Sequence, residues 1–96
     1  MIGVVATLTI QEGKAQDFET HFTALAAKVR ELESGNHLYQ LTKSRTEPNV
    51  YKVLELYADQ DALTHHGKTD YFRAAGAAFG GLLAAAPHIE YLDTVG

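Results

Sequence analysis

The segment YKVLELYADQDALTHHGKTDYF, residues Tyr51–Phe72, decides the fold because it contains a strand, a tight turn and a short helix in succession. Positions 50–57 alternate with the two-residue period of a strand. This period places Glu55 and Tyr57 on one face together with Val53, while lysine and leucine side chains occupy the other face. Burying a carboxylate on such a face is costly unless the group has a partner or a function.

Two helices are expected after this strand. Asp59 can accept hydrogen bonds from amide groups two or three residues on, which caps a short helix beginning near Gln60 and ending at Gly67. Thr69 or Asp70 then caps a further helix that is rich in alanine and glycine. Spacings of four, three and four separate Phe72, Gly76, Phe79 and Leu83, which is the period of a helix.

The sequence before this segment begins with a strand and a long helix. Residues 3–11 alternate as a strand whose two faces are both fairly apolar. From Lys14 to Glu33 apolar residues recur at spacings of three and four, which predicts an amphipathic helix. They are Phe18, Phe22, Leu25, Val29 and Leu32. Gly35 follows at the position where a residue in the left-handed conformation commonly closes a helix.

Two further strands complete the pattern. Residues 37–44 form a strand in which Tyr39 shares a face with Leu41, and a polar loop joins it to positions 50–57 as a hairpin. Pro87 is expected to close the alanine-rich helix. Residues 88–95 alternate again and predict a fourth strand.

The resulting order is strand, helix, strand, strand, two helices and strand, without repeats or linkers. This order predicts an α+β fold of the ferredoxin-like βαββαβ type, with a four-stranded antiparallel sheet and helices on one face. We expect residues 1–96 to form a single domain. The other sheet face would leave apolar residues in water, so we also expect a homodimer that packs face to face or as a barrel.

Composition excludes several classes of function. The net charge is −4 and the eight Lys and Arg residues are scattered, so nucleic acid is not expected as a partner. The chain has no cysteine, which excludes disulfides and thiolate chemistry and is compatible with a reducing cytosol. No segment has the pattern of a signal peptide or a membrane span, so we expect a cytoplasmic protein that does not enter a membrane.

Common catalytic motifs are not found. His65 and His66 are adjacent and would point about 100° apart on a helix, so they cannot chelate one metal ion. No HExxH pattern is present, and no metal is expected. Neither of the two serines, Ser34 and Ser44, lies in a G-x-S-x-G elbow, which leaves a serine hydrolase without support.

The remaining candidate site consists of Glu55, Tyr57 and His66. His66 shares the inward side of its helix with Leu63, whereas His65 falls on the solvent side. Two interpretations remain open: these groups face a cavity and act there, or Glu55 and His66 satisfy each other as a structural pair. A cavity could lie beside the small residues of the last helix, with aromatic walls. The candidates for these walls are Phe18, Phe22, Tyr39, Tyr57, Phe72 and Phe79.

Several of these features occur together in a known family. They are Glu33-x-Gly35-x-x-x-Tyr39, Pro48, Glu55-x-Tyr57-x-Asp59, Leu63-x-x-His66 and Phe72. With them, nearly the whole chain resembles the antibiotic biosynthesis monooxygenase superfamily of dimeric α+β-barrel proteins, which includes quinol monooxygenases and a phospho-autoinducer-2 isomerase.

The resemblance implies a homodimer with a pocket between sheet and helices. It also implies that molecular oxygen attacks a phenolic or quinol-like small molecule without any cofactor. Glu55 and His66 match the family's strand glutamate and helix histidine, which implies acid/base or hydrogen-bonding roles. Tyr57 stands where many members have tryptophan, which implies stacking on the substrate. Substrate contacts are likewise expected from Tyr39, Phe72 and Phe22.

Other functions within the same frame stay open. One alternative is an isomerase of a small phosphorylated metabolite, although no cluster of Lys or Arg marks a phosphate site. A second is a dimeric module that binds a small ligand without converting it. The haem-degrading branch is disfavoured, because the positions of its Asn, Trp and His hold Ala6, His66 and Gly76 here.

Overall fold

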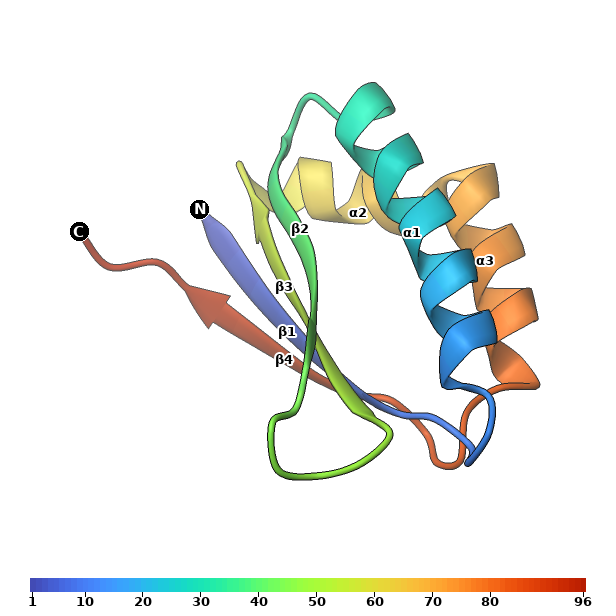
Figure 1. The fold of residues 1–96 in the computed structure, drawn as a ribbon. Coiled ribbons are helices and arrows are strands. Elements are labelled where there is room, and N and C mark those ends of the chain that lie inside the picture. The colour runs from blue at the N-terminus through green and yellow to red at the C-terminus, as the bar shows by residue number, and fades with distance from the viewer.

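Residues 1–96 form four strands and three helices in a computed structural model (Figure 1). The elements are β1 (Ile2–Thr9), α1 (Ala15–Leu32), β2 (Asn36–Lys43), β3 (Val50–Tyr57), α2 (Gln60–Lys68), α3 (Asp70–Gly80) and β4 (His88–Asp93). The strands make one sheet in the order β2-β3-β1-β4, and every neighbouring pair is antiparallel. The predicted ferredoxin-like α+β fold is therefore confirmed.

All three helices cover the same face of the sheet (Figure 1). The strand register brings Ala6 of β1 between Val53 of β3 and Ile89 of β4, so these side chains point to one face. Phe18 and Phe22 of α1 are almost completely buried against this face. The core therefore lies between the sheet and the helices, and the opposite sheet face is left without a covering layer.

None of the three helices is long and apolar enough to cross a membrane.

The end of α3 differs from the prediction. The helix stops at Gly80, well before Pro87, because the amides of Leu82 and Leu83 both turn back to the carbonyl of Phe79. Leu82 then accepts a hydrogen bond from the backbone N–H of Gln11, and Leu83 forms a bridge with the residue after β1. Pairing with the end of β1 therefore replaces the last turn of helix that the sequence pattern predicts.

Gly35 has a different role from the one predicted. It does not adopt a left-handed conformation, and α1 closes instead through a hydrogen bond from the amide of Glu33 to the carbonyl of Val29. A Cβ atom at Gly35 would lie 2.6 Å from the Cβ of Ala62 on α2. The carbonyl of Gly35 also accepts a hydrogen bond from Ala58 just before α2. The residue is needed because two backbone segments approach closely here.

Gly35→Ala is expected to lower the free energy of unfolding by about 1–3 kcal/mol, because the added methyl group overlaps Ala62. Urea denaturation measures the change. Gly76→Ala is the control, since a Cβ there meets nothing within 4 Å and alanine is the better helix former. Adding Ala62→Gly to Gly35→Ala should recover part of the loss, and no coupling between the two substitutions would contradict the steric explanation.

Candidate active site

A cavity of about 740 Å³ lies between the helices and the sheet. Its wall is mainly apolar and is formed by residues of all four strands together with side chains of all three helices. The predicted wall residues Phe22, Tyr39 and Phe72 line it, and so do Glu55 and His66. Phe79 also lines it, so the fold brings six of the predicted residues to one cavity, whereas the predicted Phe18 does not line it. This volume lies in the range of pockets for small organic molecules.

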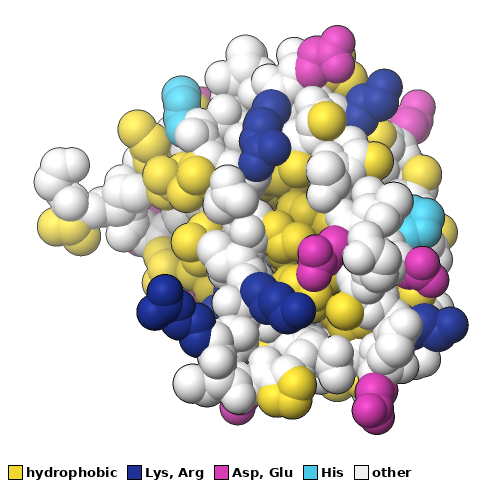
Figure 2. All heavy atoms as spheres, viewed as in Figure 1, with side chains coloured by type: hydrophobic (Ala, Val, Ile, Leu, Met, Phe, Trp, Pro, Cys, Tyr) yellow, Lys and Arg dark blue, Asp and Glu magenta, His cyan; other side chains and the backbone are white.

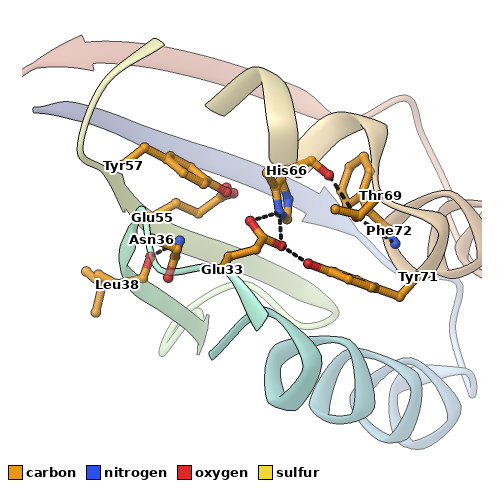
Figure 3. Close-up of polar contacts among 9 residues, drawn as sticks. All are labelled: Glu33, Asn36, Leu38, Glu55, Tyr57, His66, Thr69, Tyr71 and Phe72. Atoms are coloured by element: carbon orange, nitrogen blue, oxygen red, sulfur yellow. Dashed lines mark hydrogen bonds and ion pairs between the residues drawn. The ribbon is translucent and has the colours of Figure 1, made fainter. Parts of the chain in front are cut away.

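His66 is held at the cavity by aromatic rings and a carboxylate. It lies in the last turn of α2 and its side chain is buried. Its ring centroid is 4.5 Å from that of Phe72 and 5.2 Å from that of Tyr39. Nδ1 lies 3.0 Å from each carboxylate oxygen of Glu33 (Figure 3). The ring is therefore fixed in both position and orientation.

Glu33 is the functional residue that the sequence analysis missed. Its carboxylate points between His66 and Tyr71, and Oε2 also accepts the hydroxyl of Tyr71 at 2.5 Å (Figure 3). Glu33 is 5% exposed, whereas Leu32, which the sequence places on the buried stripe, is 55% exposed. A spacing of four from Val29 leads to Glu33, so the buried stripe ends on a carboxylate. That spacing, and the presence of Glu33 among the family markers, were the available signals.

The contact with Glu33 determines which ring nitrogen of His66 is free. An ionised carboxylate only accepts hydrogen bonds, so we assign the proton of the neutral ring to Nδ1. Nε2 is then an unprotonated acceptor. Every side-chain nitrogen or oxygen atom that is fully buried in the structure has a hydrogen-bond partner. Nε2 has no partner in the protein, so it is not one of the fully buried atoms. Because His66 lines the cavity, we infer that Nε2 opens into it.

Glu55 is a second titratable group at the cavity. It lies on β3 opposite Tyr39 of β2, and its Oε1 accepts the hydroxyl of Tyr57 at 2.6 Å. Burial raises the pKa of Glu55 to about 7, and the negative charge of Glu33 adds to the rise, while the hydrogen bond from Tyr57 opposes it. Near neutral pH this carboxyl group can therefore give or take a proton.

The two predicted catalytic residues do not pair with each other. His66 binds Glu33 and Glu55 binds Tyr57, so the interpretation of Glu55 and His66 as one structural pair is wrong. The reason is that α1 ends close to α2 and supplies the partner of His66 from a distant part of the sequence.

Tyr57 is not part of the cavity wall. It is completely buried, and its ring lies 5.4 Å from that of His66, so the stacking on a substrate that the resemblance implies has no support in this geometry. Tyr39 does line the cavity and stacks on Phe22 at 5.4 Å. Burial, and then the charge of Glu55, raise the pKa of Tyr39, so its hydroxyl stays protonated.

The charge of the cavity limits what it can bind. The ionisable groups in its wall are Glu55, His66, Asp93 and two tyrosines, and it contains neither Lys nor Arg. A dianionic phosphate would lie beside a carboxyl group without a cationic partner. His, Asp and Glu side chains do not gather in groups of three anywhere in the structure, so no cluster of ligands for a metal is formed. The site suits an uncharged, largely apolar molecule with a polar group.

The pKa of Glu55 should make stability depend on pH. This pKa is about 7 in the folded chain, compared with 4.5 for an ordinary glutamate, which stands for the unfolded chain. The contribution of Glu55 to the free energy of unfolding is therefore fully present below pH 4.5 and is lost as the pH rises through 7. As the pH rises from 5 to 8, the free energy of unfolding of Glu55→Gln should therefore increase by roughly 1–3 kcal/mol relative to that of the wild type. Urea denaturation at both values measures it. Exposed Glu12→Gln is the control, and an equal gain there would contradict the assignment.

Comparison with known proteins places the chain in a family. The model for antibiotic biosynthesis monooxygenases matches residues 1–78. A candidate antibiotic biosynthesis monooxygenase from Caulobacter crescentus CB15 is 64% identical, with a TM-score of 0.97 over 99% of this chain and 90% of that one. PA3566 from Pseudomonas aeruginosa is 27% identical, with a TM-score of 0.89 over 99% and 94% of the two chains.

A candidate monooxygenase of the same family name from Nitrosomonas europaea shares the fold, with a TM-score of 0.91 at 14% identity and coverage of 99% of each chain. A search of curated protein sequences finds no match. The cavity between sheet and helices, the matched residues and the identity to the Caulobacter protein agree. The chain belongs to the antibiotic biosynthesis monooxygenase family.

Proposed function

We propose that this protein is a cofactor-independent monooxygenase that acts on a small planar phenolic or quinol-like metabolite. The observation that carries the proposal is the His66 Nε2 atom, which faces an apolar cavity while Nδ1 is bonded to a buried carboxylate. This arrangement suits a general base that removes a proton from a hydroxyl group. Membership of the antibiotic biosynthesis monooxygenase family also supports it.

The first step proposed is deprotonation of the substrate. A phenolic hydroxyl group gives its proton to Nε2 of His66, and the carboxylate of Glu33 stabilises the imidazolium that forms. The other product is a phenolate, whose negative charge spreads over the ring and makes it a good electron donor. The apolar wall excludes water, which would otherwise stabilise the anion and slow its oxidation.

The second step proposed is reaction of this anion with oxygen. The anion passes one electron to O2, and the resulting radical pair combines into a peroxide at the ring carbon that shares the negative charge of the oxygen. This carbon carries one hydrogen atom in the phenolic tautomer and is the CH2 carbon of the corresponding ketone tautomer. Glu55, with a pKa of about 7, is suited to supply the proton that the peroxide needs. Loss of water then leaves a carbonyl group. Counted from the ketone tautomer, a CH2 group and O2 become C=O and H2O, so the substrate supplies all the electrons.

The phosphorylated substrate of an isomerase fits this cavity less well. The wall of the cavity carries Glu55 and Asp93 and no Lys or Arg side chain. A phosphate group would therefore be repelled there and would have no cationic hydrogen-bond donor. A phenol or quinol needs neither. A module that only binds a ligand gives no reason for a buried Glu33–His66 pair with its free nitrogen in the cavity, because burying two such groups is costly.

Oxygen uptake tests the proposal. The wild type should consume oxygen with at least one member of a panel of hydroquinones and anthrones. His66→Ala and Glu33→Gln should lower kcat by roughly 10²–10⁴, because they remove the base or the carboxylate that stabilises its protonated form. His65→Ala is the matched control, since this neighbouring histidine is exposed and does not line the cavity. An oxygen electrode measures each rate.

Other results would point to the other functions. Saturable binding of a phenol that survives His66→Ala, with no oxygen uptake, would favour a binding module. Turnover of phosphorylated linear sugars under anaerobic conditions would favour an isomerase. Equal oxygen uptake by the wild type and His66→Ala would show that His66 is not the base.

We also propose that the protein is a homodimer in which the uncovered sheet face is buried. Leu38 and Leu54 lie on this face and are 38% and 36% exposed. Hydrophobic side chains gather along the side of the molecule on which the two chain ends lie (Figure 2). Apolar strand residues that stay in water cost roughly 25 cal/mol per Å². A second copy would remove them from water.

Light scattering at micromolar concentration should give a mass about twice the 10.5 kDa of one chain. Leu54→Glu should shift the mass toward that of one chain, because a carboxylate cannot be buried in an apolar interface without a partner. Leu32→Glu is the control, since Leu32 is exposed on α1, on the helical side. A wild-type mass of one chain would contradict the proposal.

A further inference from the structure

Tyr71, in the first turn of α3, is connected to the proposed base His66 through Glu33. It does not line the cavity, yet its hydroxyl donates to Oε2 of Glu33 at 2.5 Å. The same carboxylate accepts Nδ1–H of His66 at 3.0 Å. Figure 3 shows the three side chains in a row, with Glu33 in the middle. Each comes from a different helical segment: the end of α1, α2 and α3.

The hydroxyl of Tyr71 limits how Glu33 can lie. A carboxylate bound by one donor can turn about its side-chain bonds and still keep that hydrogen bond, whereas two donors on different helices fix its plane. Burial, and then the hydrogen bond to Glu33, raise the pKa of Tyr71 to about 12, so its hydroxyl remains a donor at neutral pH. Glu33 is therefore held as an acceptor for Nδ1–H.

The residues around Tyr71 hold the histidine as well. Thr69 caps α3 by accepting the amide of Phe72, and its hydroxyl donates to the carbonyl of His66 at 2.9 Å. Phe72 packs its ring 4.5 Å from the imidazole. The start of α3 thus contacts the backbone of His66, the face of its ring and, through Glu33, its Nδ1 atom.

We propose that Tyr71 is a positioning residue for the base: by fixing the carboxylate of Glu33 it keeps the proton of His66 on Nδ1 and the lone pair of Nε2 directed into the cavity. This inference rests on the proposed function of His66. It assigns no contact between Tyr71 and the substrate. Removing the hydroxyl of Tyr71 should therefore change the rate of the chemical step and not the affinity for the substrate.

The chain offers a matched control for removing this hydroxyl. Tyr51 also donates to a glutamate of α1, Glu19, at 2.5 Å, and burial raises the pKa of Tyr51 to about 12 as well. Tyr51 does not line the cavity, and Glu19 has no contact with His66. Tyr71→Phe and Tyr51→Phe therefore remove the same kind of hydrogen bond, and only one of them is connected to the base.

The first measurement needs no substrate. Nitrogen-15 NMR of the histidine rings should show His66 of the wild type protonated on Nδ1, and Tyr71→Phe should give a mixture of the two tautomers, while Tyr51→Phe matches the wild type. Thermal unfolding of both variants shows that the fold is kept. An unchanged Nδ1–H tautomer in folded Tyr71→Phe would overturn the inference, whether or not the protein proves to be an oxygenase.

The second measurement uses the oxygenase assay. Tyr71→Phe should lower kcat by roughly ten- to a hundredfold with KM within about twofold, because the lost hydrogen bond is one to a charged group that acts only through His66. Tyr51→Phe should leave both constants within about twofold of the wild type. Equal losses of kcat in the two variants would mean that Tyr71 contributes only to stability, and would overturn the inference.

Discussion

The arrangement of this molecule depends on one buried carboxylate. Glu33 follows the last turn of α1, and its oxygens receive hydrogen bonds from His66 on α2 and Tyr71 on α3. Without these donors the carboxylate would be a buried charge lacking compensation, which costs several kcal/mol. The same contacts join the ends of three helices and orient the imidazole. Folding and the proposed chemistry therefore make use of the same interaction.

The sheet was predictable from the sequence because each strand has a clear two-residue period and each turn contains suitable residues. His66 was also predictable, since its helical phase relative to Leu63 separates it from His65. Its partner was not. Leu32 and Glu33 fit a period of 3.6 residues almost equally well at the end of α1, and hydrophobicity alone favours the leucine. Only the packing of α2 against that end makes the carboxylate the buried residue.

The misassigned glycine has a similar explanation. Gly35 has the sequence context of a helix-closing residue, but its actual constraint is the approach of Ala62, which is distant in sequence. Tyr57 lies on the predicted face of the sheet but does not line the cavity, because a side chain that faces the helices does not have to reach the cavity. Local periodicity gives the direction of a side chain. It does not give the neighbours that tertiary packing brings to it.

The part of α3 that lines the cavity affects how the substrate range of such proteins can change during evolution. Gly76 lines the cavity, and a Cβ atom added there would have open space around it. A larger residue at this position would reduce the space for a ligand without disturbing the sheet or the residues that orient the imidazole. Substrate range can therefore diverge by single mutations in one helix while the base stays intact. A small frame of this kind can adapt to many metabolites.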